Sequence, residues 1–256
     1  MPPAAALAIA RFGILEAART RLPWLVAAAL ALALAAGMFL EQLALAEAAR
    51  IRVTAFAAGA RLALVVILAL HVLGSVAREF NDKGLELVLA ADLPRWHYIL
   101  GRLAGFIAVA WLLAIPATLV QLAQCPPAAA LQWGLSLALE LSIVAALALF
   151  CIVTFTQLVP AAGFVLGFYV LARSLAAMQL MGAAPIGSHG VLHRLLAGGV
   201  DALALVVPSL DRYAATGWLV DHAMSWASLA AQAGETLLYV AVLAAAATFD
   251  FYRREL

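Results

Sequence analysis

The stretch Arg78–Arg102, REFNDKGLELVLAADLPRWHYILGR, is the densest run of charge in a sequence that is otherwise mostly apolar. It holds the chain's only lysine and eight other ionisable residues: Arg78, Glu79, Asp82, Lys83, Glu86, Asp92, Arg95, His97 and Arg102. Long apolar runs flank it on both sides, and a charged segment of this length is excluded from the hydrocarbon of a bilayer. We therefore expect it to lie in water between two membrane spans.

This charged stretch has a pattern of its own. Asp82-Lys83-Gly84 breaks the helix that leaves the membrane, and the residues that follow, Leu85–Ala91, predict a short amphipathic helix. Pro94 then suits the first turn of the helix that re-enters the membrane. Residues 78-97 are therefore predicted to form a loop outside the bilayer that carries a short helix along the membrane surface.

The composition is that of a membrane protein. Hydrophobic residues make up 67% of the chain and charged residues 11%, with a mean hydropathy of +1.05, whereas soluble domains are about a quarter charged. The net charge of +1 excludes the broad basic field of a nucleic-acid-binding protein. Cys125 and Cys151 lie at opposite ends of one predicted span, too far apart for a disulfide. The fold class is therefore an all-α polytopic membrane protein.

The apolar runs predict one transmembrane domain, 1-256, with six transmembrane helices. Residues 1-21 before them predict an amphipathic elbow helix at the membrane interface, the alternative being a frayed, positively charged tail. The first span and Ala44-Leu45-Ala46 also imitate a signal peptide, although the apolar run is longer than usual for one. The expected spans are Leu22–Leu45, Val53–Ala77, Tyr98–Gln121, Ala129–Phe155, Pro160–Leu180 and Gly234–Phe251.

Residues 181-232, before the last span, differ from the rest. Their apolar stretches, such as Leu195–Val207, fall short of the about 20 residues that a span needs. Gly198-Gly199, Asp201 and Pro208 interrupt them. We expect broken half-helices at the outer face, with Trp218 and Trp226 at the membrane interface.

The arginines predict the orientation. An even number of spans puts both termini and the Arg78–Arg102 stretch on one side, and cationic residues gather on the cytoplasmic side of membrane proteins. We therefore expect both termini to be cytoplasmic. The expected inner set is Arg11, Arg19, Arg21, Arg78, Lys83, Arg95, Arg102, Arg253 and Arg254, and the outer set is Arg50, Arg52, Arg194 and Arg212.

A family resemblance rests on the charged stretch. An acidic residue, a basic residue and a glycine precede a short helix rich in leucine and glutamate, followed by Pro-Arg and by Tyr-x-x-Gly-Arg. This resembles the first cytoplasmic loop of ABC-2-type transporter permeases, the membrane subunits of type V ABC exporters. The motif covers about a tenth of the chain, and the layout of spans extends the likeness over nearly all of it. The matching residues are Glu79, Asp82, Lys83, Gly84, Glu86, Leu87, Leu89, Pro94, Arg95, Tyr98, Gly101 and Arg102.

The resemblance implies a permease subunit of an ATP-binding cassette exporter in the bacterial inner membrane, which is not itself an enzyme. Two permease subunits, identical or different, would sit on two ATPase subunits that bind ATP and Mg²⁺, with no cofactor on this chain. The phosphate loop Gly-x4-Gly-Lys-[Ser/Thr] does not occur in the sequence, so the ATPase is expected on a separate chain. The residues implied in ATPase coupling are Glu79, Asp82, Lys83, Gly84 and Glu86, with Leu87 and Leu89 as packing contacts.

Ionisable residues inside the predicted spans form a second candidate site. Counted from the inner ends at about 1.5 Å per residue, Arg61, Glu140 and Arg173 fall in one layer about 20–24 Å deep. Gln132, Ser136 and Glu140 share one helix face. We expect Glu140 to pair with Arg173 or Arg61, because unpaired charges are costly in a membrane. A structural clamp and a polar lining of a transport path are both open interpretations.

Other functions lead to different expectations. A proton-coupled secondary transporter would use Glu140 and His71 as a proton relay and would show internal repeats, whereas a packing role is the alternative for His71. An intramembrane enzyme or cofactor-maturation protein would need a cluster of His, Cys or Asp at one depth. His189 and His193 have the spacing of a metal-binding pair on one helix face, but no Cys, Asp or Glu lies near them in sequence.

Overall fold

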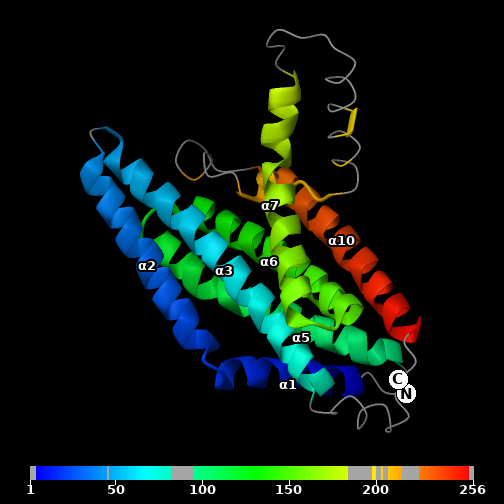
Figure 1. The fold of residues 1–256 in the computed structure, drawn as a ribbon. Coiled ribbons are helices and arrows are strands. Elements are labelled where there is room, and N and C mark those ends of the chain that lie inside the picture. The colour runs from blue at the N-terminus through cyan, green and yellow to red at the C-terminus, as the bar shows by residue number, and fades with distance from the viewer. Residues whose placement is uncertain are drawn as a thin grey trace.

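A computed structural model of the chain describes residues 4–44, 46–81, 95–183, 198–199, 203, 207–214, 219 and 225–253. Within these residues every regular element is a helix. Six helices are long and apolar enough to cross a bilayer, so the prediction of an all-α, multi-pass membrane protein is confirmed. The helices are α1 (Ala4–Arg19), α2 (Leu22–Leu43), α3 (Ala48–Asn81), α5 (Arg95–Leu122), α6 (Pro127–Phe155), α7 (Leu158–Ala183), α9 (Leu210–Ala214) and α10 (Trp226–Arg253) (Figure 1).

Proline and turn residues set several helix limits. Pro23 and Pro127 lie in the first turns of α2 and α6, where the missing N–H of proline would have had no partner within the helix. Thr156 adopts a left-handed conformation (φ 59°) that ends α6 and turns the chain into α7. Glu47, with φ 52°, makes the corresponding turn before α3.

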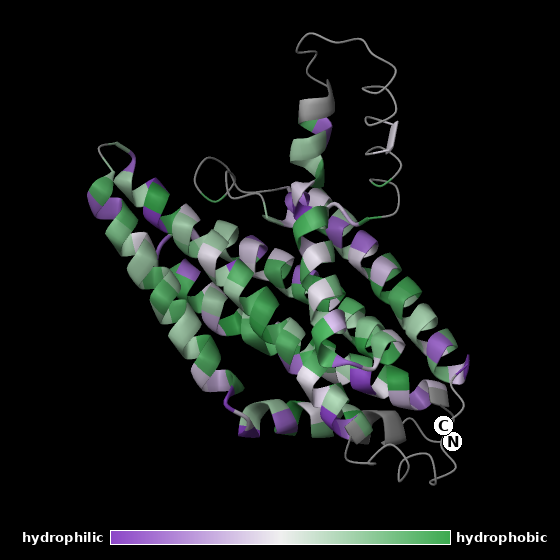
Figure 2. Ribbon diagram, viewed as in Figure 1, coloured by the Kyte–Doolittle hydropathy of each residue, from purple (hydrophilic) through white to green (hydrophobic). Residues whose placement is uncertain are grey.

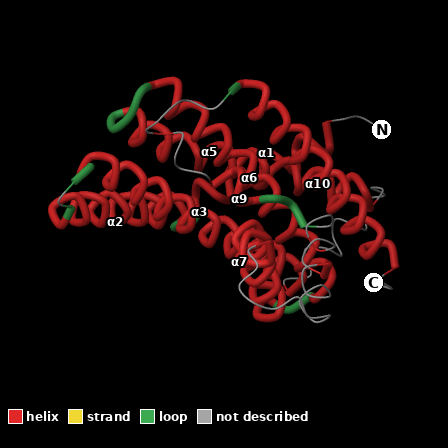
Figure 3. Tube along the Cα trace, turned by 90° about the horizontal axis from the view of Figure 1, so that it is seen from above, coloured by secondary structure: helices red, strands yellow, loops and turns green. Residues whose placement is uncertain are grey.

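The helix at the centre of the bundle is α6. Of the 18 most apolar consecutive residues of α6, 83% are buried inside the protein, whereas the corresponding share is 28% in α2 and 22% in α10. It packs against α3, α5, α7, α9 and α10, while α2 pairs with α3 at one edge of the bundle (Figures 1 and 3). Apolar residues make up most of the length of the spans, and polar residues are more frequent toward their ends (Figure 2).

Two glycines allow close helix contacts. A Cβ on Gly134 of α6 would lie 2.1 Å from Thr118 Oγ1 of α5, and a Cβ on Gly105 of α5 would lie 3.1 Å from the carbonyl oxygen of Ala10 in α1. Small residues at such points let membrane helices approach backbone to backbone. Gly105 therefore helps to hold α1 against α5, across one end of the bundle (Figure 1).

The structure corrects two predicted boundaries. The second span belongs to a helix that begins at Ala48 rather than Val53, because Arg52 forms an ion pair of 3.0 Å with Glu41 of α2 and so remains compatible with a helix. The last helix begins at Trp226 rather than Gly234. The end of the expected half-helix region 181-232 is thus part of a spanning helix, in which an isolated glycine is tolerated.

Candidate functional site

The predicted intramembrane layer is centred on an ion pair between α3 and α6. The Arg61 guanidinium donates a hydrogen bond from Nη1 to Glu140 Oε2. Both side chains are sealed from the surface, with exposures of 1% for Arg61 and 0% for Glu140. The Arg61 guanidinium also lies over the ring of Trp133, 5.4 Å from its centroid. The sequence predicts either Arg61 or Arg173 as the partner of Glu140, and in the structure Arg61 is the one that contacts Glu140 directly.

Tyr169 of α7 connects the ion pair to Arg173. Its hydroxyl donates to Glu140 Oε1 at 2.9 Å and accepts a hydrogen bond of 2.9 Å from Arg173 Nη1. Arg173 Nη1 itself lies 4.0 Å from Glu140 Oε1. Glu140 therefore joins three helices, α3, α6 and α7, through one carboxylate.

The other polar residues of this α6 face, Gln132 and Ser136, lie about two turns and one turn before Glu140. Gln132 and Ser136 are buried, and the Ser136 hydroxyl donates at 2.9 Å to the carbonyl oxygen of Tyr213 in α9. The Tyr213 hydroxyl lies 2.8 Å from the carbonyl oxygen of Gln232 in α10. Burial raises the pKa of Tyr213 to about 12, so its phenol stays protonated as a hydrogen-bond donor. Ser136 thus ties α9, and through it α10, to the central helix.

The layer carries a net positive charge. Arg61 and Arg173 contribute two cations and Glu140 one anion, and within the described residues Arg61 Nε and Nη2 have no hydrogen-bond partner. The Arg173 side chain is 30% exposed, in contrast to the sealed Arg61. Arg61 and Glu140 are therefore suited to clamp the bundle, and Arg173 is the member of the layer that can meet another molecule.

His71 does not take part in this layer. It lies ten residues beyond Arg61 on α3, which corresponds to about 15 Å along the helix. Its ring packs edge-on against Phe106 of α5, with 6.3 Å between ring centroids. A direct proton exchange between His71 and Glu140 does not fit this separation.

A second polar network lies where the Arg78–Arg102 stretch joins its two helices. Glu16 of α1 accepts hydrogen bonds from the Ser75 hydroxyl at 2.7 Å and from Arg78 Nη2 at 3.1 Å. Arg102 of α5, only 2% exposed, donates to Ser75 at 2.6 Å and pairs with Glu79 at 2.9 Å. This network connects α1, α3 and α5, and we name it the inner-end network because it lies at the predicted inner ends of the spans. Its members are Glu16, Ser75, Arg78, Glu79, Tyr98 and Arg102.

Aromatic residues complete the inner-end network. The Tyr98 hydroxyl donates to Glu79 Oε2, and the Tyr98 ring stacks on Phe251 of α10 with 5.8 Å between centroids. The Arg102 guanidinium lies 4.7 Å from the centroid of the Phe106 ring. The last turn of α3 and the first turns of α5 are therefore fastened to each other and to α10.

The protonation state of Glu16 depends on this network. Burial alone would raise the pKa of Glu16, but the hydrogen bond from Ser75, the charge of Arg102 and the hydrogen bond from Arg78 outweigh burial and hold that pKa below its ordinary value. A carboxyl with a lowered folded-state pKa stabilises the folded protein above its unfolded pKa, and this contribution disappears as pH falls through the folded pKa. Glu16 should thus hold α1 in place at neutral pH.

Replacing Glu16 by glutamine should therefore change how stability depends on pH. Relative to the wild type, the variant should unfold at a lower temperature at pH 7, and the difference should shrink as the pH falls below about 4. Thermal unfolding in detergent between pH 7 and pH 3 measures this difference. Glu47→Gln, at an exposed glutamate in the turn before α3, is the matched control. A difference that stays constant with pH would contradict a charged Glu16.

Most of the predicted coupling residues fall outside the described part of the chain. These are Asp82, Lys83, Gly84, Glu86, Leu87 and Leu89, and their role stays a prediction. Glu79 is described, and its carboxylate is bound by Arg102 and Tyr98. His189 and His193 also fall outside the description; in the residues it covers, no group of three His, Cys, Asp or Glu side chains could hold a metal ion.

Tyr169 and Glu16 are members of these sites that the residue patterns of the sequence did not predict. Tyr169 is four residues before Arg173, a spacing that puts both on one helix face and could have suggested their contact. Glu16 is the only acidic residue before Glu41, and in a segment flanked by arginines it could have suggested a pairing. Distance along the chain hid the pairing of Glu16 with Arg102, because their two helices meet only in the tertiary structure.

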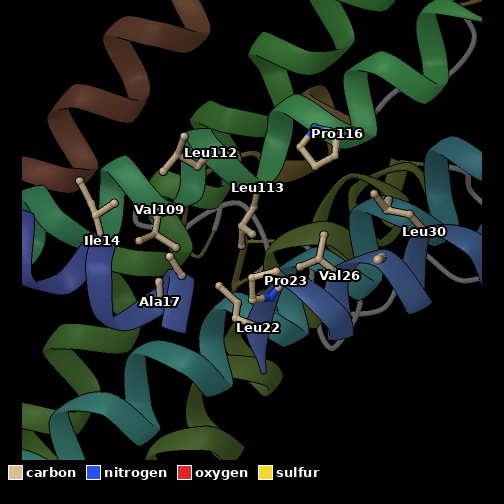
Figure 4. A pocket seen from close by; sticks show the side chains of 12 residues that line it. Ile14, Ala17, Leu22, Pro23, Val26, Leu30, Val109, Leu112, Leu113 and Pro116 are labelled. Carbon is tan, nitrogen blue, oxygen red and sulfur yellow. The ribbon is translucent and has the colours of Figure 1, made fainter. Parts of the chain in front are cut away.

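An apolar cavity of about 290 Å³ lies between α1, α2 and α5, close to the inner-end network (Figure 4). The residues that line it offer no ionisable or nucleophilic group, so it adds no chemistry to either polar site. The lining residues include Ile14, Ala17, Leu22, Pro23, Val26, Leu30, Val109, Leu112, Leu113 and Pro116.

No protein-family model matches the chain, and a search of curated proteins finds no matching sequence.

Proposed function

We propose that this chain is the membrane-spanning permease subunit of an ATP-binding cassette exporter, driven by a separate ATPase subunit. The observation that carries the proposal is the charged Arg78–Arg102 stretch between two spanning helices, with its resemblance to the first cytoplasmic loop of ABC-2-type permeases. In this proposal the short helix in Leu85–Ala91 docks on the ATPase. The cargo is unidentified, and ATP and Mg²⁺ bind to the ATPase.

The inner-end network supports a mechanical role for this stretch. Arg102 and Tyr98 of α5 both bind Glu79 of α3, so the two helices that carry the stretch are joined directly at its base. Glu16 joins α1 to the same point. A push on the short helix would therefore move α1, α3 and α5 together, and this is what coupling ATP hydrolysis to a change in the spans requires.

A second permease subunit would complete the transporter, and α7 offers a surface for it. Of the 18 most apolar consecutive residues of α7, only 28% are buried within this chain. Gly163 and Gly167 form a G-x-x-x-G pair at which an added Cβ would meet open space. Such a pair lets membrane helices approach each other closely. We propose that α7 packs against the second subunit, identical or different.

The alternative is a proton-coupled secondary transporter that uses Glu140 and His71. Glu140 is held by Arg61 and Tyr169 without exposure to the surface, and His71 packs against Phe106 at another depth. A relay needs a group that gains and loses a proton along a continuous path. The geometry therefore favours a clamp for Glu140 and weighs against this alternative.

The proposed location is the bacterial inner membrane, with both termini cytoplasmic, because arginines gather at the end of the bundle that carries α1. In a background without Cys125 and Cys151, a cysteine at Ser225 should react in intact cells with a membrane-impermeant maleimide. A cysteine at Asn81 should react only after the membrane is opened. Labelling of Asn81 alone in intact cells would reverse the proposed orientation.

Purification of the chain from its native membrane tests the proposed function. We expect a stoichiometric partner that carries a phosphate-binding Walker A loop, and we expect its ATP hydrolysis in liposomes to depend on this chain. The secondary-transporter alternative predicts instead transport that follows a proton gradient without ATP. Proton-driven transport by the chain alone would overturn the proposal.

A further inference from the structure

A pocket of about 430 Å³ opens between α2 and α3, beside the turn that joins α1 to α2. One part of its wall is apolar and includes Leu25, Ile67 and Leu70. The other part is polar and consists of Thr20, Arg21, His71 and Arg78. The pocket is thus divided into an apolar groove and a cationic mouth.

This division coincides with the edge of the membrane that the spanning helices predict. Arg21 immediately precedes the span Leu22–Leu43, and Arg78 lies near the end of the span Ala48–Phe80. Leu25 and Leu70 lie further inside these spans and are about half exposed on the surface of the bundle. The groove therefore faces hydrocarbon and the mouth faces the headgroup region, which is the arrangement of a phospholipid itself.

The cationic mouth is not neutralised by the protein. The Arg21 side chain is exposed and makes no hydrogen bond or ion pair with the described residues. Arg78 is 59% exposed, and within the described part of the chain its one ion pair runs from Nη2 to Glu16, which also binds Ser75 and Arg102. Counting Arg21, Arg78 and Arg102 against Glu16 and Glu79 leaves one positive charge.

The start of α2 adds to this attraction. The Arg21 side chain does not cap the first turn of α2, and Leu22 N donates only a long hydrogen bond of 3.4 Å to Thr20 Oγ1. The positive end of the helix dipole therefore lies at the same mouth as Arg21. Helix N-termini and arginine guanidinium groups both favour phosphate oxygens. Basic pockets between membrane helices bind anionic headgroups for the same reason.

We propose that this pocket is a binding site for an anionic phospholipid. The phosphate would lie between Arg21 and Arg78, and one acyl chain would follow Leu25, Ile67 and Leu70. The apolar cavity between α1, α2 and α5 differs from this pocket, because no cationic residue lines it and it could not distinguish one lipid headgroup from another. The lipid would brace the junction of α1, α2 and α3, next to the inner-end network.

Native mass spectrometry of the purified chain tests the site. The protein is equilibrated with phosphatidylglycerol or phosphatidylcholine of identical acyl chains, and the lipid retained per protein is measured at rising collision energy. We expect one phosphatidylglycerol to be retained preferentially. Arg21→Gln should weaken that retention about fivefold, the effect of one arginine near a charged headgroup. Arg11→Gln removes an exposed arginine of α1 outside the pocket and should have little effect.

Three outcomes would overturn the proposal. Equal retention of both lipids by the wild-type chain would show that the pocket ignores the headgroup, and this comparison needs no variant to fold. An equal loss in Arg21→Gln and Arg11→Gln would show a general charge effect. Displacement of the retained phosphatidylglycerol by inorganic phosphate alone would show that the mouth binds free phosphate rather than a lipid.

Discussion

Replacing Glu140 by glutamine should destabilise the bundle by about 3–5 kcal/mol, the effect of breaking a buried ion pair by removing one partner. Glu140 contacts Arg61 of α3 and Tyr169 of α7 with no exposure to the surface. The amide would leave the Arg61 charge uncompensated in a site from which water is excluded. The measurement is the midpoint of denaturant or thermal unfolding in detergent, with Glu47→Gln, at an exposed glutamate, as the control.

A double-mutant cycle separates the pair from its surroundings. Arg61→Met together with Glu140→Gln removes both charges, and the combined loss should be smaller than the sum of the single losses. Arg173→Gln should cost less than Arg61→Met, because Arg173 is partly exposed and reaches Glu140 mainly through Tyr169. Strict additivity of Arg61→Met and Glu140→Gln would refute a direct coupling between them.

Replacing both Leu87 and Leu89 by aspartate should release the proposed ATPase subunit while the permease stays in the membrane. Apolar side chains at the centre of a protein interface supply most of the binding energy, and charged residues around them set register and association rate. Two carboxylates in that centre should therefore abolish co-purification. The measurement is the ratio of ATPase to permease after affinity purification, with membrane insertion checked by fractionation.

Single changes of the charged residues are the matched control. Lys83→Gln or Glu86→Gln leaves the apolar contact intact, so the ATPase should remain bound. Transport should weaken more than assembly, which would appear as ATP hydrolysis without export. If the double aspartate variant kept both its partner and its transport, the Arg78–Arg102 stretch would be a solvated loop and the exporter proposal would fail.

The fold class and the number of spans follow from hydropathy along the chain. Hydrocarbon excludes unpaired backbone groups, so long apolar runs such as Ala129–Phe155 have to be helical whatever their neighbours are. Depth along a helix follows from its rise per residue, which is why residue counting alone assigns Arg61, Glu140 and Arg173 to one layer. Hydropathy did not predict that α3 begins at Ala48 and α10 at Trp226. Paired charges and an isolated glycine lower the hydropathy but do not end a membrane helix.

The choice of partners within a layer, in contrast, depends on tertiary packing. Depth does not fix how a helix is rotated about its axis, so the choice between Arg61 and Arg173 depended on how α3 and α7 pack against α6. The same is true of Glu16, whose partners Ser75 and Arg102 come from two other helices. Local sequence sets the length and polarity of each helix, whereas rotation and neighbours are set by the shapes of all the side chains that pack together.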